Sequence, residues 1–211
     1  LSIRRQRQMC IRDRPWLGPA RLGPGPGLGT GRPFDFRIGG RIAVVNFNRF
    51  IYSSENGEIY LGAGSIKSDN EAKVFIDLGA SFIVSPFFDK GIALLCKKND
   101  IPYIPGCGSL TEMITAEKHG AKLLKLFPGG VYGPKFISSV LSPCPWLKIM
   151  PTGGVTAEIE NISQWFSSGA FCIGMGSKLI SKKFLLDNDF GALKNHILNV
   201  IEIINNVCEV N

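Results

Sequence analysis

From about residue 40 onward the chain repeats one pattern, in which a short apolar or β-branched run is followed by a segment with helical periodicity. Most of these runs lie about 20 to 25 residues apart and end near Gly, Pro or Ser. They are "RIAVVNFN" (41–48), "IYLGAGS" (59–65), "FIVSP" (82–86), "PYIPG" (102–106), "LLKLFP" (123–128), "KIMPTGG" (148–154) and "FCIGMGS" (171–177). Repeated strand-then-helix units favour parallel strands joined by right-handed crossovers.

Capping residues mark several of the helices between these runs. In "SDNEAKVFIDLGA" we expect Ser68 to be the N-cap and Gly79 the stop. The segment "SLTEMITAEKHG" begins with a capping box from Ser109 to Glu112. A third helix is predicted in "AEIENISQWFSSGA".

Two architectures fit this order, an open doubly wound sheet and a closed barrel. An open sheet concentrates glycines at one switch-point loop, whereas nearly every predicted strand here ends in Gly, Pro or Ser, as if all the ends meet at one place. This favours an α/β fold of the (β/α)₈ TIM-barrel type. Seven strands are visible and only "FDFRI" (34–38) is available as an eighth, so we expect the N-terminal units to be incomplete.

Length and composition predict one soluble domain. The chain has 211 residues, 45% of them hydrophobic, and contains no apolar run long enough to span a membrane. Its six cysteines are scattered, with no C-x-x-C and no Cys or His at metal-ligand spacing. We therefore expect no metal, no cofactor and no disulfide framework, and a cytoplasmic location.

The net charge of +7 comes from one end of the chain. Residues 1–41 hold nine arginines against two aspartates, and the remaining charges balance. All arginines lie at or before Arg49, and all lysines at or after Lys67. The rest of the chain therefore has no basic excess that would indicate a nucleic-acid partner.

We interpret residues 1–33 as a disordered Arg/Gly/Pro-rich leader and residues 34–211 as the barrel domain, because the leader has too few apolar side chains to offset its ordering entropy. An Arg-rich, acid-poor leader is typical of a mitochondrial presequence, but the Gly/Pro tract disfavours the amphipathic helix that a presequence needs. The stretch "RQRQMCIRDR" is similar to translated sequencing-adapter DNA. With the switch from arginine to lysine, this favours an artefactual or chimeric N-terminus.

Lys125 stands in the apolar run "LLKLFP", at the expected carboxyl end of a buried strand. If Leu124 and Leu126 face the helices, Lys125 points into the barrel. The alternative is an ion pair with a carboxylate or an outward side chain, but no acidic residue occurs in the later strand segments. An unpaired lysine in apolar surroundings has a lowered pKa and is a competent Schiff-base nucleophile.

Glycine pairs end the last two predicted strands, in "PTGGV" and "GMGSK". Barrels commonly bind phosphate at these two loops through backbone N–H groups. Glycine is also the usual residue of tight turns, so these pairs allow either interpretation. No Walker loop, G-x-G-x-x-G or G-x-S-x-G motif indicates a nucleotide-binding protein or an esterase.

These motifs together resemble the 2-keto-3-deoxy-6-phosphogluconate aldolase / 4-hydroxy-2-oxoglutarate aldolase family over residues 60–205. The matching segments, in order, are "GAGS", "FIVSP", "IPYIPGCGSLTE", "KLFPG", "IMPTGGV" and "CIGMGSKLIS". The resemblance implies a class I aldolase of (β/α)₈ fold, assembled as a homotrimer, whose partners are pyruvate and a 2-keto acid phosphate. It assigns the Schiff-base lysine to Lys125.

The resemblance also implies the remaining site residues. Ser65 and Thr152 would lie beside pyruvate, and Pro86 and Phe127 would pack against it. The phosphate would bind to the backbone and side chains of Gly153, Gly154, Gly176 and Ser177.

The N-terminal third departs from the family pattern. A gapless placement of "GGRIAVVNFNRF" on the family's second strand keeps Arg49, which would bind the substrate carboxylate, but puts Val45 where the acid/base glutamate belongs. Only twelve residues separate Arg49 from Gly62, so the following helix is cut short.

The predicted function is cleavage of 2-keto-3-deoxy-6-phosphogluconate or 4-hydroxy-2-oxoglutarate to pyruvate plus glyceraldehyde 3-phosphate or glyoxylate. Two alternatives stay open at this point. One is a sugar-phosphate-binding barrel enzyme without covalent catalysis, and the other is a truncated, non-catalytic remnant whose barrel does not close.

Overall fold

The computed structural model describes residues 42–46, 50–55, 58–187 and 189–210. The predicted leader at 1–33, the candidate strand at 34–38 and Arg49 lie outside these residues. The strands are β1 (Ile42–Asn46), β2 (Phe50–Glu55), β3 (Glu58–Gly62), β4 (Ile83–Val84), β5 (Tyr103–Ile104), β6 (Gly106–Cys107), β7 (Leu124–Leu126), β8 (Ile149–Pro151) and β9 (Ile173–Met175). The helices are α2 (Asp69–Asp77), α3 (Lys90–Lys98), α4 (Leu110–Lys118), α5 (Gly129–Tyr132), α6 (Pro134–Leu141), α7 (Ile159–Ser167), α8 (Lys182–Leu186) and α9 (Phe190–Val210).

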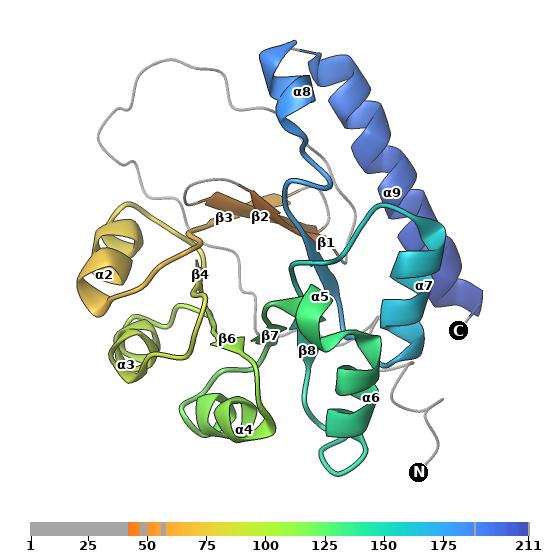
Figure 1. Cartoon of the computed structure of the whole chain (residues 1–211). Helices are drawn as coiled ribbons and strands as arrows, with labels where there is room; N and C mark the ends of the chain where they lie inside the picture. The colour runs from red at the N-terminus through yellow and green to blue at the C-terminus, as the bar shows by residue number, and fades with distance from the viewer. Residues whose placement is uncertain (1–41, 47–49, 56–57, 188, 211) are drawn as a thin grey trace.

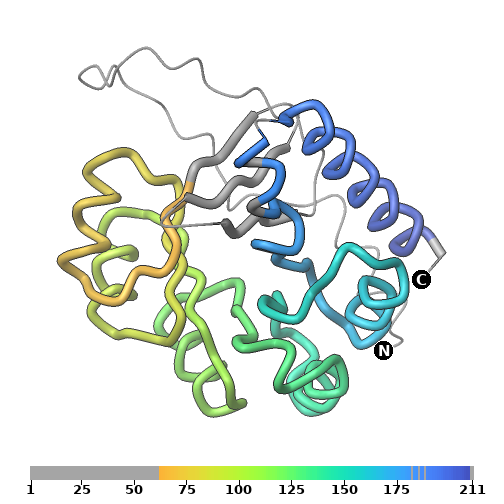
Figure 2. The backbone as a smooth tube through the Cα atoms, turned by 45° about the horizontal axis from the view of Figure 1, so that its top comes forward, coloured from red at the N-terminus to blue at the C-terminus, as the bar shows by residue number. Residues whose placement is uncertain are grey.

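The described strands close into a ring. Parallel pairing joins β4 to β5 and runs from β6 through β7 to β8, and only Pro105 separates β5 from β6. Single bridges between Ala63 and Ile83 and between Thr152 and Gly174 connect β3 to β4 and β8 to β9. The ring closes where β1 pairs in parallel with β9. Helices α2, α3, α4, α6, α7 and α9 flank it on the outside (Figures 1 and 2).

The N-terminal strands differ from the prediction of an all-parallel sheet. Strand β2 was not predicted from the sequence, and it is antiparallel to both β1 and β3. Only three residues separate Asn46 from Phe50, whereas a parallel crossover needs a dozen or more, so the chain returns as an antiparallel strand.

This topology also corrects the placement of Val45 on the second strand of the barrel. Strand β1, which contains Val45, lies next to the last strand β9, where the first strand of a closed parallel barrel lies. The neighbouring position, between β1 and β3, is occupied by the antiparallel strand β2.

Apolar side chains pack on both sides of the strands. Inside the ring, Phe82, Val84, Ile104, Leu123 and Met150 form one cluster. Alternate residues of the same strands pack against the helices in two larger clusters. This alternation follows from the two-residue period of a strand, and it determines which side chains reach the interior.

The predicted helix signals are confirmed. Ser68 caps α2, where its Oγ accepts from the Glu71 N–H at 3.2 Å, and the chain leaves that helix at Gly79 with φ +88°. Ser109 caps α4 in the same way. The carboxylate of Glu112 accepts from the Gly108 N–H, one residue before the N-cap, which is a variant of the predicted box.

Helix α9 was not among the predicted helices, although its sequence carries a clear signal. Its buried residues recur every three or four positions and face the barrel and α7. They are Leu193, Ile197, Val200, Ile204 and Val207.

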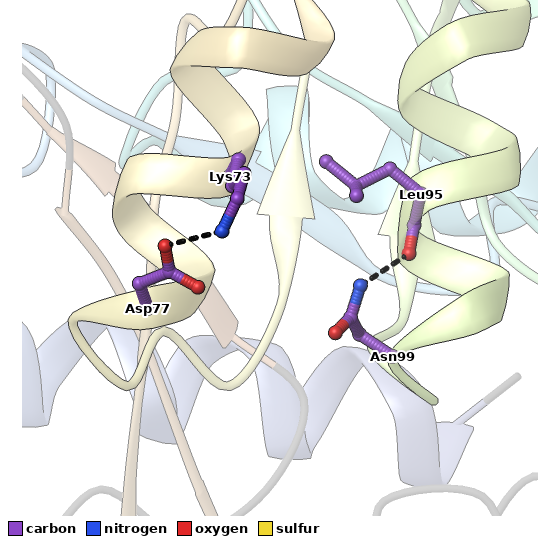
Figure 3. Close-up of polar contacts among 4 residues, drawn as sticks. All are labelled: Lys73, Asp77, Leu95 and Asn99. Atoms are coloured by element: carbon purple, nitrogen blue, oxygen red, sulfur yellow. Dashed lines mark hydrogen bonds and ion pairs between the residues drawn. The ribbon is translucent and has the colours of Figure 1, made fainter.

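Figure 3 shows two polar contacts on the surface of α2 and α3. Lys73 and Asp77 form an ion pair one turn apart on α2, with 2.7 Å between Nζ and Oδ2. The Asn99 side-chain amide donates to the Leu95 carbonyl at 2.8 Å at the end of α3. Both contacts are solvent-exposed, so each contributes little to stability.

Candidate active site

Lys125 lies in the centre of β7 and points into the barrel. Its neighbours Leu124 and Leu126 pack in the helix-facing cluster, while Leu123 belongs to the interior cluster. Lys125 shares the face of Leu123 because residues two apart in a strand point the same way. Its side chain is only 7% exposed. The inward orientation expected from the sequence is therefore confirmed.

The electrostatics of Lys125 are those of a buried, unpaired amine. Burial lowers the pKa of Lys125 from 10.5 to about 8, and no carboxylate of the described residues forms an ion pair with it. The Nζ atom lies 4.5 Å from the centroid of the Phe127 ring. An amine with such a pKa is partly unprotonated at neutral pH and has a free lone pair to attack a carbonyl carbon.

Thr152 follows β8, the strand next to β7. Its N–H donates to the Leu126 carbonyl at 3.0 Å. Thr152 therefore lies one residue beyond Pro151, the last residue of β8 that pairs with β7. The side chain is 5% exposed, and its Oγ1 atom has no hydrogen-bond partner among the described residues. A buried hydroxyl without a partner costs about 1–3 kcal/mol, so this atom is suited to binding a ligand oxygen.

Gly153 and Gly154 form a tight junction with the start of α5. Both have positive φ, +73° and +93°. The carbonyl of Gly153 accepts from the Gly130 N–H, and a Cβ on Gly154 would lie 2.6 Å from the Gly130 nitrogen. The close approach alone is enough to require glycine at position 154, whether or not the loop also binds a ligand.

The other predicted site residues lie at the same end of the barrel, where the parallel strands finish. Ser65, which follows β3, has the unusual φ of +61° and is exposed. Pro86 follows β4, and its carbonyl packs against Gly106, the ladder partner of Lys125. These placements bring Pro86 close to the lysine strand.

Gly176 and Ser177 follow β9. The Gly176 carbonyl accepts from the N–H groups of Leu179 and Ile180 in a turn, at 2.9 and 3.0 Å, and Ser177 is exposed.

Ser85 and Tyr103 form a buried hydroxyl pair that was not predicted from the sequence. Ser85 Oγ lies 2.7 Å from Tyr103 Oη, and both hydroxyls contact the carbonyl of Phe87. The Asp89 N–H donates to Tyr103 Oη at 3.1 Å. Burial raises the pKa of Tyr103 to about 12, so the phenol keeps its proton. The pair fixes the loop that contains Pro86; its only sequence signal is a serine at the end of an apolar run.

The described residues hold neither a metal-binding group of side chains nor a membrane-spanning helix. They contain no group of three or more His, Cys, Asp or Glu side chains that could hold a metal ion. Within the same ranges, no helix is both long enough and apolar enough to cross a membrane.

Comparison with known proteins identifies the family. A family model described as "KDPG and KHG aldolase" matches residues 45–196. The chain belongs to this family. The family resemblance drawn from the sequence is confirmed.

This chain matches its curated relatives in the KDPG and KHG aldolase family over only part of the relatives' length. The 2-dehydro-3-deoxy-6-phosphogalactonate aldolase of Escherichia coli (strain K12) is 31% identical over 120 residues, which cover 56% of this chain and 58% of that protein. The 2-dehydro-3-deoxy-phosphogluconate aldolase of Treponema pallidum (strain Nichols) is 28% identical over 153 residues, covering 71% of this chain and 72% of the relative. The chain thus spans less than two thirds of the Escherichia coli protein.

A solved structure confirms the fold. KDPG aldolase from Legionella pneumophila, with pyruvate captured as a covalent carbinolamine intermediate, superposes with a TM-score of 0.63 at 22% identity, covering 68% of this chain and 69% of that one. This likeness supports the TIM-barrel architecture predicted from the sequence, with β2 as the departure described above.

Proposed function

We propose that the chain is a class I aldolase that cleaves a 4-hydroxy-2-keto acid to pyruvate and an aldehyde through a Schiff base at Lys125. The observation that carries the proposal is the environment of Lys125. It is buried, points into the barrel, has no carboxylate partner among the described residues and has a pKa lowered to about 8. Few structural roles favour an amine in such surroundings, whereas a covalent nucleophile needs them.

The chemistry follows from the amine. The neutral Nζ attacks C2 of the keto acid to give a carbinolamine, which loses water to form an iminium. When the C4 hydroxyl gives its proton to a water molecule, the electrons of the C3–C4 bond move into the iminium, the aldehyde leaves and an enamine remains. Protonation at C3 and addition of water then release pyruvate and restore Lys125.

Neighbouring groups would bind the substrate around this centre. The partnerless Thr152 hydroxyl is suited to the pyruvate carboxylate, Pro86 and Phe127 to its apolar side, and Ser65 to its polar rim. The Gly153, Gly154, Gly176 and Ser177 loops would receive a phosphate on substrates that carry one.

The acid/base step is expected to be slow. The sequence placement that put Val45 in the position of the family's glutamate is corrected by the pairing of β1 with β9, so no residue is assigned to the acid/base step. A reaction without a positioned acid/base is typically about 10²- to 10⁴-fold slower. Adduct formation at Lys125 should therefore be easier to detect than turnover. The homotrimer that the resemblance implies is likewise a proposal, which analytical ultracentrifugation tests.

Borohydride trapping tests the proposal directly. Incubation with pyruvate and sodium borohydride should add one reduced pyruvate, mapped by mass spectrometry to Lys125. Lys125→Met should lose the label, and Lys122→Met, which removes an exposed lysine of the same segment, should keep it. Equal labelling of Lys125→Met, or labelling only at other lysines, would refute the proposal.

A further inference from the structure

Tyr132 and Gly108 fit together at the carboxyl end of the barrel. Tyr132 ends α5, the short helix that directly follows β7 and projects inside the ring of outer helices (Figure 1). A Cβ built on Gly108 would collide with the Tyr132 hydroxyl and lie 3.0 Å from its Cζ atom. The missing side chain at position 108 therefore makes the space that the phenol oxygen occupies.

The ladder places this hydroxyl next to the lysine strand. Gly106 pairs with Lys125, and Gly108 is two residues further along. The β6–β7 ladder continues beyond Gly106, because the Phe127 N–H donates to the Cys107 carbonyl at 3.2 Å. Gly108 directly follows β6 at its carboxyl end, so the phenol that contacts it lies at the end of the barrel where the strand of Lys125 also finishes.

Two hydroxyls thus flank β7 from opposite sides. Thr152 follows β8 on one side, and Tyr132 covers the end of β6 on the other.

The Tyr132 ring is fixed while its oxygen is free. The ring packs against Phe136 with 4.9 Å between centroids. The side chain is 37% exposed, and its hydroxyl makes no hydrogen bond to another described residue. A rigid ring with an uncommitted hydroxyl is suited to binding a polar ligand group at low entropic cost.

We propose that the Tyr132 hydroxyl binds the C4 oxygen of the aldol substrate, on the aldehyde side of the bond that breaks. The inference rests on the proposed function and names the group that recognises the second half of the substrate. With C2 attached to Nζ and the carboxylate beside Thr152, C4 extends toward β6. In condensation Tyr132 donates to the aldehyde carbonyl, and in cleavage it donates to the oxygen that becomes that carbonyl, keeping its own proton throughout.

Tyr132→Phe tests the inference, because it removes only the oxygen and leaves the ring on Phe136. Borohydride trapping of pyruvate, which involves no aldehyde, should stay within about twofold of the parent. The kcat/KM for cleavage of 4-hydroxy-2-oxoglutarate should fall by about 10- to 100-fold, the effect of losing one hydrogen bond to a charged oxygen.

Gly108→Ala provides an independent variant, because it puts a methyl group where the hydroxyl lies. It should reproduce the selective loss of cleavage, and it should add little to Tyr132→Phe. The exposed neighbour Val131, changed to Ala, serves as the matched control and should leave both activities unchanged. Circular dichroism confirms that each variant is folded.

Three outcomes would overturn the inference. Cleavage by Tyr132→Phe at the parental rate shows that the oxygen has no role, and equal loss of trapping and cleavage shows that the ring acts only in packing. Failure of the parent to trap pyruvate refutes the proposed function, and this inference with it.

Discussion

Replacing Lys125 with methionine should make the protein more stable at neutral pH. The side chain is buried without a carboxylate partner among the described residues, and its pKa is lowered from 10.5 to about 8. This difference of roughly 2.5 pKa units corresponds to about 3 kcal/mol lost by burying the ammonium. The contact with the Phe127 ring returns about 0.5–2 kcal/mol of that loss. Methionine has similar length and no charge, so we expect Lys125→Met to raise the free energy of unfolding by about 1–3 kcal/mol.

The pH dependence identifies the cause. In the folded protein the amine is neutral above about pH 8, whereas in the unfolded chain it stays protonated until about pH 10.5. Unfolding therefore takes up a proton in this window, so the parent gains stability as the pH rises. The advantage of Lys125→Met should be fully present below about pH 8 and should shrink as the pH approaches about 10.5.

Urea unfolding of both proteins at a series of pH values measures this difference. Lys122→Met, at an exposed lysine, is the control and should change the unfolding free energy by less than about 0.5 kcal/mol at every pH. A Lys125→Met protein that is less stable than the parent at pH 7, or a difference that does not vary with pH, would refute the reasoning. Either result would mean that the ammonium has a compensating partner.

Two further variants test the loops around the site. Gly154→Ala introduces a Cβ against the backbone of Gly130 at a positive φ and should cost about 1–3 kcal/mol more than Gly79→Ala, which has a similar φ but no atom within 4 Å; equal losses in urea unfolding would show that the close approach is relaxed. Tyr103→Phe leaves the Asp89 N–H without its phenol partner and should cost about 1–2 kcal/mol, measured in the same way. An unchanged unfolding free energy in Tyr103→Phe would mean that water replaces the phenol.

The sequence by itself determined the features that depend on local chemistry. The caps at Ser68 and Ser109 and the stop at Gly79 were predicted because each acts on backbone groups within four residues. The inward direction of Lys125 followed from strand alternation between Leu124 and Leu126. The family resemblance rests on short motifs and on their order along the chain, and both can be read from the sequence alone.

Only the tertiary structure decided which distant segments meet. The pairing of β1 with β9, such as Ala43 opposite Gly174, joins the two ends of the described barrel. The antiparallel direction of β2 depends on its neighbours β1 and β3, and no periodicity in one strand specifies this. The repeated strand-then-helix pattern therefore predicted parallel strands where the chain forms an antiparallel meander.

The same reason explains the site residues that the sequence did not reveal. Ser85 and Tyr103 are eighteen positions apart and gain a shared role only because β4 and β5 lie side by side. Gly108 and Tyr132 come together because α5 folds back over the end of β6. Local sequence specifies which way a side chain points along its own element, but its partner on another element is selected by the packing of the whole barrel.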